Sequence, residues 1–191
     1  EDEDEDDLLV SSNPMGELPD LLLEIIRDEA LNAKLKNNKG IRTAAYDAYS
    51  RVCYADGRFD EVADAFSRMI SENIPRTVHT YNSLLLSFEA SCKWREAENT
   101  MNLMKKETPE ILPDALTFDA LIDVCEEMGQ WDRATQYLED AQNKYGYLGC
   151  EDELGVLDLH RVRSAGTAQC VLRWWLRRMR QRALAPMDIQ S

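Results

Sequence analysis

The chain has 191 residues, of which 44% are hydrophobic, and a formal net charge of −14. A chain of this length can bury a substantial core in one or two domains, whereas no apolar run approaches the ~20 residues that a membrane-spanning helix requires. The sequence begins with EDEDEDD rather than with methionine or a basic leader. We therefore expect a processed or partial product without a visible secretory signal and without a membrane contact.

The charge is distributed unevenly along the chain. Residues 1–7 contribute seven carboxylates, residues 43–149 hold 19 acidic and 10 basic residues, and residues 159–183 hold seven arginines and no acidic residue. Residues 1–16 are predicted to be an acidic, disordered and solvated head. A role for this head as bait for a basic partner is the alternative.

Residues 17–40 are predicted to contain an amphipathic helix followed by a loop. The apolar residues of ELPDLLLEIIRDEALNAKL fall on one helical face, at Leu18, Leu21, Leu22, Ile25 and Ile26. This helix either caps the N-terminal end of the segments that follow or is the remnant of a degenerate repeat. The string KNNKG at 36–40 predicts the loop.

Three segments then repeat one pattern, starting at Thr43, Val78 and Ala115, which are 35 and 37 residues apart. Five positions match in all three copies: an aromatic fourth residue, a small fifteenth, an aromatic seventeenth, a small apolar twentieth and a large apolar twenty-fourth. Given in the order of the three copies, the fourth residue is Tyr46, Tyr81 or Phe118, and the fifteenth is Gly57, Cys92 or Gly129. The seventeenth is Phe59, Trp94 or Trp131, the twentieth is Val62, Ala97 or Ala134, and the twenty-fourth is Phe66, Met101 or Leu138. A period of this size indicates a repeat architecture.

Each repeated segment is predicted to be a pair of helices. In the second copy, Tyr81, Leu84, Leu85 and Phe88 occupy one helical face. The small fifteenth residue marks the turn between the helices, where a left-handed conformation is common, and Pro75 and Pro113 end the first two units. Paired helices that recur in this way predict a stacked helical solenoid.

The strings VHTYNSLLLSF, WREA and ILPDA of the second segment resemble a pentatricopeptide repeat (PPR), and the resemblance covers residues 43–149. The tetratricopeptide repeat, of ~34 residues, is the near rival. It favours a tryptophan early in its first helix, where this chain has tyrosine or phenylalanine. The resemblance implies three PPR units, at 43–77, 78–114 and 115–149, each contacting about one base of single-stranded RNA.

In the family that this chain resembles, the fifth and the last residue of a unit select the base. The middle unit offers Asn82 and Asp114, a pair that implies a preference for uracil. The first unit offers Asp47 and Thr77, which is not a familiar pair, and the third unit offers Asp119 without a clear closing partner.

Composition qualifies what the resemblance implies. Phosphate neutralisation dominates RNA affinity, and the net charge of −9 over residues 43–149 predicts weak binding by these units alone. A surface that binds a protein is the alternative. Because Tyr81, Trp94 and Trp131 recur at packing positions, we expect core aromatics rather than base-stacking platforms there.

The glycine-containing string YGYLGCEDELG predicts a domain boundary before residues 154–191. The following string, VLDLHRVRSAGTAQCVLRWWL, resembles the start of a small MutS-related (Smr) domain, an α/β fold, with a short strand at 156–159 and a helix at 164–182. The TGxG or HGxG motif of that family does not occur in the chain. Asp158 and His160 match positions implicated in nucleic-acid cleavage, which is conditional on a complete domain in the parent chain. We favour a structural role for both residues.

The predicted helix at 164–182 is basic and amphipathic. We expect phosphate contacts from Arg173, Arg177, Arg178 and Arg180; a solvated face, or a contact with the acidic head or a partner, is the alternative. The cysteines Cys53, Cys92, Cys125, Cys150 and Cys170 are expected to be buried reduced thiols, with zinc binding as the alternative. No metal or other cofactor is expected.

Together these features predict a mostly α-helical chain, namely an α-solenoid of helix-turn-helix repeats followed by the start of an α/β Smr domain. We expect a non-enzymatic PPR-SMR factor of plastid gene expression that binds single-stranded RNA, with the mitochondrion as the alternative location. One alternative function is a scaffold docked on a large assembly such as the plastid RNA polymerase or ribosome. The other is an Smr-type endonuclease.

Overall fold

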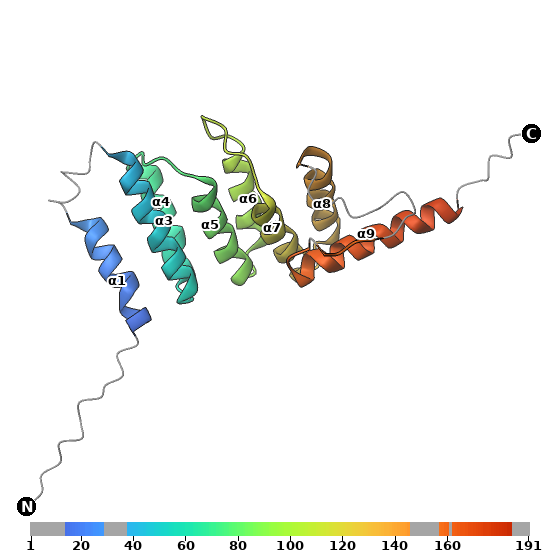
Figure 1. Ribbon diagram of the computed structural model, residues 1–191, viewed down its shortest axis with the longest axis horizontal. Helices are drawn as coiled ribbons and strands as arrows, with labels where there is room; N and C mark the ends of the chain where they lie inside the picture. Colours follow the sequence, from blue (N-terminus) through green and yellow to red (C-terminus); the bar gives the residue numbers. More distant parts are fainter. Residues whose placement is uncertain (1–13, 29–37, 146–156, 161, 185–191) are drawn as a thin grey trace, which may run out of the picture. The chain divides into compact units, whose positions relative to one another are not determined.

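The computed structural model describes residues 14–28, 38–145, 157–160 and 162–184 (Figure 1). The chain divides into two compact units, residues 1–83 and 84–191. The predictions made for residues 1–13, for the domain boundary at 146–155, for Cys150 and Val156, and for the chain after residue 184 lie outside the described residues. Residues 14–16, predicted to belong to the disordered head, are helical.

Helices account for all the regular structure of the described residues, which form eight helices and no strand. The helices are α1 (Pro14–Arg27), α3 (Lys39–Ala55), α4 (Phe59–Ser71), α5 (Val78–Ala90), α6 (Trp94–Met104), α7 (Ala115–Glu127), α8 (Trp131–Tyr145) and α9 (Ala165–Leu184). The strand predicted at 156–159 does not extend over residues 157–159, which lead into a turn at His160. No second strand within the described residues could pair with it, and an unpaired strand is not stable alone.

In the first unit, α3 packs against both α4 and α1. The predicted core positions of the first repeat, Tyr46, Val62 and Phe66, are all buried. The ring of Phe66 meets the ring of Tyr81, at the start of α5, edge to face with 5.1 Å between centroids. This geometry favours aromatic pairs, and it fixes the start of α5 against the first pair of helices.

Two details of the first unit differ from the sequence-based expectation. Helix α3 begins at Lys39, inside the predicted loop, because the Asn38 side chain accepts a hydrogen bond from the Ile41 amide (3.2 Å) and caps the helix. Helix α1 is amphipathic as predicted, but its apolar face is only partly covered. Ile26 is buried, whereas Leu21 and Ile25 are exposed.

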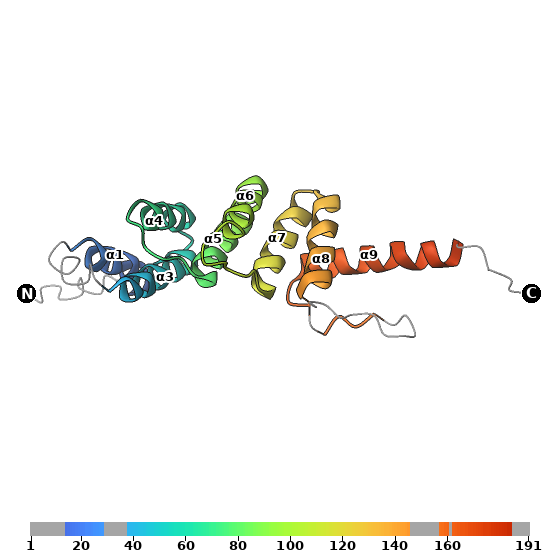
Figure 2. The same ribbon diagram turned by 90° about the horizontal axis from the view of Figure 1, so that it is seen from above.

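The second unit contains the rest of α5 and the helices α6 to α9, and α7 is its central helix. α7 contacts α6, α8 and α9, and it lies alongside α8 in both views (Figures 1 and 2). The aligned positions Ala97, Met101, Phe118, Ala134 and Leu138 are buried in one core. Cys170 and Val171 of α9 join the same core, so α9 is part of this unit. The C-terminal half of α9 extends beyond α8 (Figure 2).

The turn between the two helices of each repeat has one conformation in all three copies. The fifteenth residue has a left-handed backbone, with φ of 75° at Gly57, 55° at Cys92 and 66° at Gly129. The following amide donates to the carbonyl five residues earlier in each copy, at 2.7–2.8 Å. This is the Schellman arrangement that ends a helix, and it confirms the predicted turn even where cysteine replaces glycine.

Candidate nucleic-acid interface

The predicted base-selecting residues of the first repeat contact each other. Asp47, on α3, accepts hydrogen bonds from the hydroxyls of Thr77 (3.1 Å) and Thr80 (2.6 Å). Thr77 and Thr80 also exchange bonds between amide and hydroxyl, and so cap the start of α5. Both carboxylate oxygens of Asp47 are therefore used within the protein, in fixing α5 to α3.

The predicted base-selecting residues of the other two repeats are also built into the packing. Asn82 has 3% of its surface exposed, and Asp119 has 4%. Asp114 caps α7, because its carboxylate accepts a bond from the Thr117 amide (3.0 Å) in a reciprocal capping box. The hydroxyl of Thr167, on α9, donates to Asp119 over 3.2 Å. Asn82 and Asp114 belong to the same repeat, but Asn82 lies in the first compact unit and Asp114 in the second.

Helix α9 is capped by α7. The Asp123 carboxylate, on α7, accepts bonds from the Ser164 hydroxyl (2.6 Å) and from the amide of Thr167 (2.8 Å). Gly166 permits this approach, since a Cβ there would lie 2.5 Å from Asp123 Oδ1. A carboxylate at a helix N-terminus complements both the free amides and the macrodipole, although burial still raises the pKa of Asp123.

The start of α9 repeats the pattern at the starts of α5 and α7. Each of the three helices has a hydroxyl or carboxylate residue at its N-cap and a threonine three residues later: Thr77 and Thr80, Asp114 and Thr117, Ser164 and Thr167. The contact from Thr167 to Asp119 corresponds to the contact from Thr80 to Asp47. Helix α9 therefore docks on α7 as α5 docks on α3, which sequence periodicity alone did not reveal.

The arginines proposed for phosphate contact occupy two different environments on α9. Arg173 forms a bidentate pair with Glu126 at 2.6 and 2.7 Å, and the Glu126 side chain is nearly buried. This hydrogen bonding raises the pKa of Arg173. Arg177, Arg178 and Arg180 are exposed, and the Arg178 guanidinium lies 5.3 Å from the Trp174 ring centroid. Arg173 thus serves the contact between α7 and α9, and the other three face solvent.

The aromatic residues expected in the core do not all lie there. Tyr81 is buried, as predicted, and Trp94 is half-buried against the core. The prediction is wrong for Trp131, which is 57% exposed at the first position of α8. The cysteine prediction holds for Cys53, Cys125 and Cys170 but is wrong for Cys92, which is exposed because it occupies the turn.

An acidic cavity of about 280 Å³ lies at the start of α9, lined by Glu89, Asp123, Glu126, Glu127, Ala165, Gly166 and Gln169. Burial, together with repulsion from Asp123, Glu127 and Asp119, raises the pKa of Glu89 to about 7. The described residues contain no grouping of three or more side chains suited to holding a metal ion. None of the described helices is long and apolar enough to cross a membrane.

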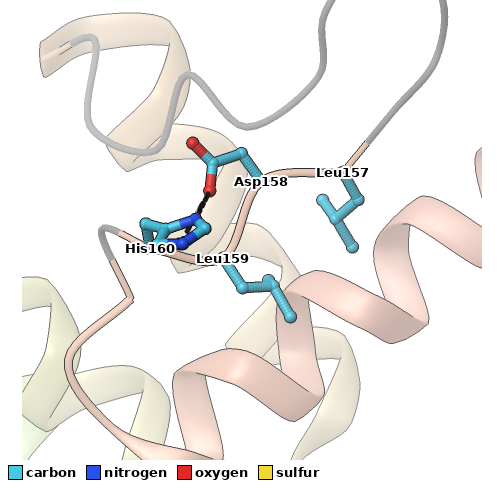
Figure 3. A pocket seen from close by; sticks show the side chains of 4 residues that line it. All are labelled: Leu157, Asp158, Leu159 and His160. Carbon is cyan, nitrogen blue, oxygen red and sulfur yellow. Dashed lines mark hydrogen bonds and ion pairs between the residues drawn. The ribbon is translucent and has the colours of Figure 1, made fainter.

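Asp158 and His160 form a close pair in an open hollow that residues 157–160 line (Figure 3). One oxygen of Asp158 lies 2.6 Å from His160 Nδ1 and accepts a bond from the His160 amide at 2.8 Å. The His160 side chain is 95% exposed. The contact between amide and carboxylate is an Asx turn, which orders the connection, and the same carboxylate orients the imidazole with Nε2 toward solvent.

Comparison with known proteins identifies one element of the chain. The family model for the PPR repeat matches residues 79–108, a stretch that includes most of α5 and all of α6. No curated protein matches the chain. The chain therefore contains a PPR repeat within an all-helical described structure, and PPR repeats are RNA-binding modules.

Proposed function

We propose that this protein binds single-stranded RNA through its PPR units, as a PPR-SMR factor of plastid gene expression. The match of residues 79–108 to the PPR repeat is the observation that supports this proposal most directly. The first and third repeats share the burial pattern of the matched repeat at the aligned fourth, twentieth and twenty-fourth positions, including Tyr46 and Phe118. The basic helix α9 would add the positive charge that the repeats lack.

Binding to labelled oligonucleotides tests this proposal. Fluorescence anisotropy should show binding of a single-stranded RNA that contains uracil and weaker binding of the matched duplex. The affinity should fall steeply between about 50 and 200 mM salt, because phosphate contacts release counterions. Binding that does not change over this range would contradict the proposal.

Base selection is tested separately. Exchange of Asn82 and Asp114 for residues of another family pair should change the preferred base of the oligonucleotide. Because Asp114 caps α7, thermal unfolding must be followed in parallel, and Asp114→Asn keeps most of the capping ability. An unaltered preference in folded variants would reject the assignment of these two residues.

A protein-binding scaffold is the second candidate, and one observation favours it. Asp47 and Asp119 already accept hydrogen bonds from threonine hydroxyls of the next helix, so these carboxylates serve packing. Such a scaffold would dock on a large assembly, for example the plastid RNA polymerase or ribosome. Absence of RNA binding at low salt would favour this candidate over the first.

Endonuclease activity is a third candidate, which the contact between Asp158 and His160 supports (Figure 3). An imidazole held by a carboxylate can act as a general base on water. In a chain that carries a complete Smr domain, RNA cleavage should vanish with His160→Ala. Cleavage that persists in this variant would remove the assignment.

A further inference from the structure

Trp131 differs from its counterparts in the other repeats. It occupies the aligned aromatic position at the start of the second helix, where Phe59 and Trp94 are half-buried. The Trp94 ring has two guanidinium groups near its face, with Arg133 at 4.7 Å and Arg95 at 5.2 Å from the centroid. Trp131 has 57% of its surface exposed. Tryptophan is enriched among the residues that dominate binding interfaces.

The indole of Trp131 lies beside a fixed guanidinium. The Arg173 Cζ atom is 5.5 Å from the ring centroid, within the range of a cation–π contact. Two hydrogen bonds to Glu126 hold that guanidinium in place, so the pair of planar groups is ordered before any ligand arrives. Ordered planar groups reduce the entropy that binding costs.

A line of positive charge continues from Arg173 along α9. Residues at i, i+4 and i+7 share one helical face, so Arg177 and Arg180 follow Arg173 over about 10 Å of helix. Both are exposed, and no ion pair of the described residues involves either of them. Helix α9 contains no acidic residue, whereas the acidic cavity lies at its start, beside Gly166. A polyanion is therefore favoured toward the C-terminal half of α9.

We propose that Trp131 is a stacking platform for one base of a single-stranded nucleic acid, with Arg177 and Arg180 binding the adjoining phosphates. This inference rests on the proposed RNA-binding function and adds a contact outside the predicted base-selecting positions. Bases stack on aromatic rings and on arginine planes without regard to sequence. The platform therefore contributes affinity, and base preference stays with the repeats.

Binding of the whole chain to a labelled single-stranded U10 oligonucleotide tests the platform. Trp131→Leu keeps an apolar side chain but removes the π-face, and it should weaken binding by about 5- to 150-fold. Trp131→Phe should keep most of the affinity. Equal losses in the two variants, or no loss in either, would overturn the platform.

The phosphate contacts are tested with a variant that changes only exposed side chains and so leaves the fold intact. Arg177→Ala with Arg180→Ala should lower the slope of log affinity against log salt by about 1.4, as expected for two lost contacts. Arg27→Ala with Lys39→Ala removes the same charge from exposed positions that precede the PPR-like segments, and should leave the slope nearly unchanged. Equal effects of the two double variants would overturn the assignment.

The outcomes separate this inference from the proposed function. If the unaltered chain binds U10 and neither Trp131→Leu nor the double arginine variant weakens binding, RNA lies elsewhere on the repeats. The platform is then rejected and the proposed function stands. If the unaltered chain does not bind U10 even at low salt, both proposals fail together.

Discussion

At the scale of single residues, Cys92 shows that the repeat imposes a backbone conformation on whatever residue occupies the turn. Its φ of 55° matches the left-handed values at Gly57 and Gly129. A left-handed conformation costs a residue with a Cβ about 1–2 kcal/mol, and glycine avoids this cost. The sequence alignment therefore placed Cys92 correctly at the turn, although its Cβ restricts the backbone in a way that glycine does not.

We expect Cys92→Gly to stabilise the protein by about 1 kcal/mol, because relief of this strain exceeds the extra freedom of the unfolded chain. Chemical unfolding in urea should show a higher midpoint with an unchanged slope. Cys92→Ala, which also removes the thiol but keeps a Cβ, is the control and should show no such gain. A gain in both variants would point to the thiol instead of the backbone.

Glu89 makes the stability of the second unit dependent on pH. Its pKa is about 7 in the folded protein and ~4.3 in an unfolded chain. Between these values the folded state holds the proton that the unfolded state has lost, so stability falls as pH rises. At pH 8 we expect Glu89→Gln to have a larger free energy of unfolding than the unaltered protein, by roughly 1–2 kcal/mol after allowance for solvent screening. The variant should therefore unfold at a higher temperature.

The comparison must be repeated at low pH. Near pH 4 both states of the unaltered protein hold the proton, so the two proteins should have nearly equal stability there. Calorimetry at pH 4 and pH 8 measures the difference. An advantage of Glu89→Gln that is the same at both pH values would show that packing, rather than ionisation of Glu89, causes it.

At the scale of elements, the attachment of α9 depends on the absence of a side chain at Gly166. An added Cβ would meet both Oδ1 and the Cα of Asp123, at 2.5 and 3.2 Å. We expect Gly166→Ala to destabilise the protein by about 1–3 kcal/mol, as overpacking does. Thermal unfolding followed by far-ultraviolet circular dichroism should report the loss of stability.

Gly40 provides the matched control for that substitution. It is likewise the second residue of a helix, α3, and a Cβ there would make only an ordinary contact of 3.7 Å, with Asn38. Gly40→Ala should therefore stabilise the protein by up to about 1 kcal/mol. Equal effects of the two substitutions would show that Gly166 acts through helix propensity and not through its contact with Asp123.

The elements were easier to predict from the sequence than their contacts. The start of every second helix coincides with the aligned aromatic residue, at Phe59, Trp94 and Trp131, because the left-handed turn two residues earlier ends the first helix at the same place in each repeat. The contact between Asp123 and Ser164 was not predictable, since the two residues are 41 positions apart and belong to segments of different pattern. The exposure of Trp131 was missed for a related reason: α9 lies beside it without burying it.

The same limit applies to the predicted base-selecting residues. Asp47 and Thr77 were paired through a family resemblance, and the structure places them in contact. The sequence did not show that Thr80 also binds Asp47, because a threonine at this position is equally typical of an ordinary helix start. Selection of bases by these residues stays a prediction.

At the scale of the whole molecule, the formal net charge of −14 opposes compaction. Excess like charge destabilises a folded protein through self-repulsion, and salt screens it. We expect the unfolding temperature to rise by roughly 2–4 °C, or about 1 kcal/mol, between 10 and 150 mM sodium chloride. RNA affinity should fall over the same range, so opposite salt trends in the two measurements are the expected result.

The cap that Asp123 provides for α9 has a consequence for the order of events during synthesis. In the first turn of α9, the Thr167 amide donates a hydrogen bond to Asp123, a residue that leaves the ribosome 44 positions earlier. Helix α7 is thus available as a template when α9 emerges, and domains generally fold from the N-terminal side during translation. A nascent chain released before Thr167 would leave the carboxylate of Asp123 without its threonine partner, and its acidic surroundings uncovered.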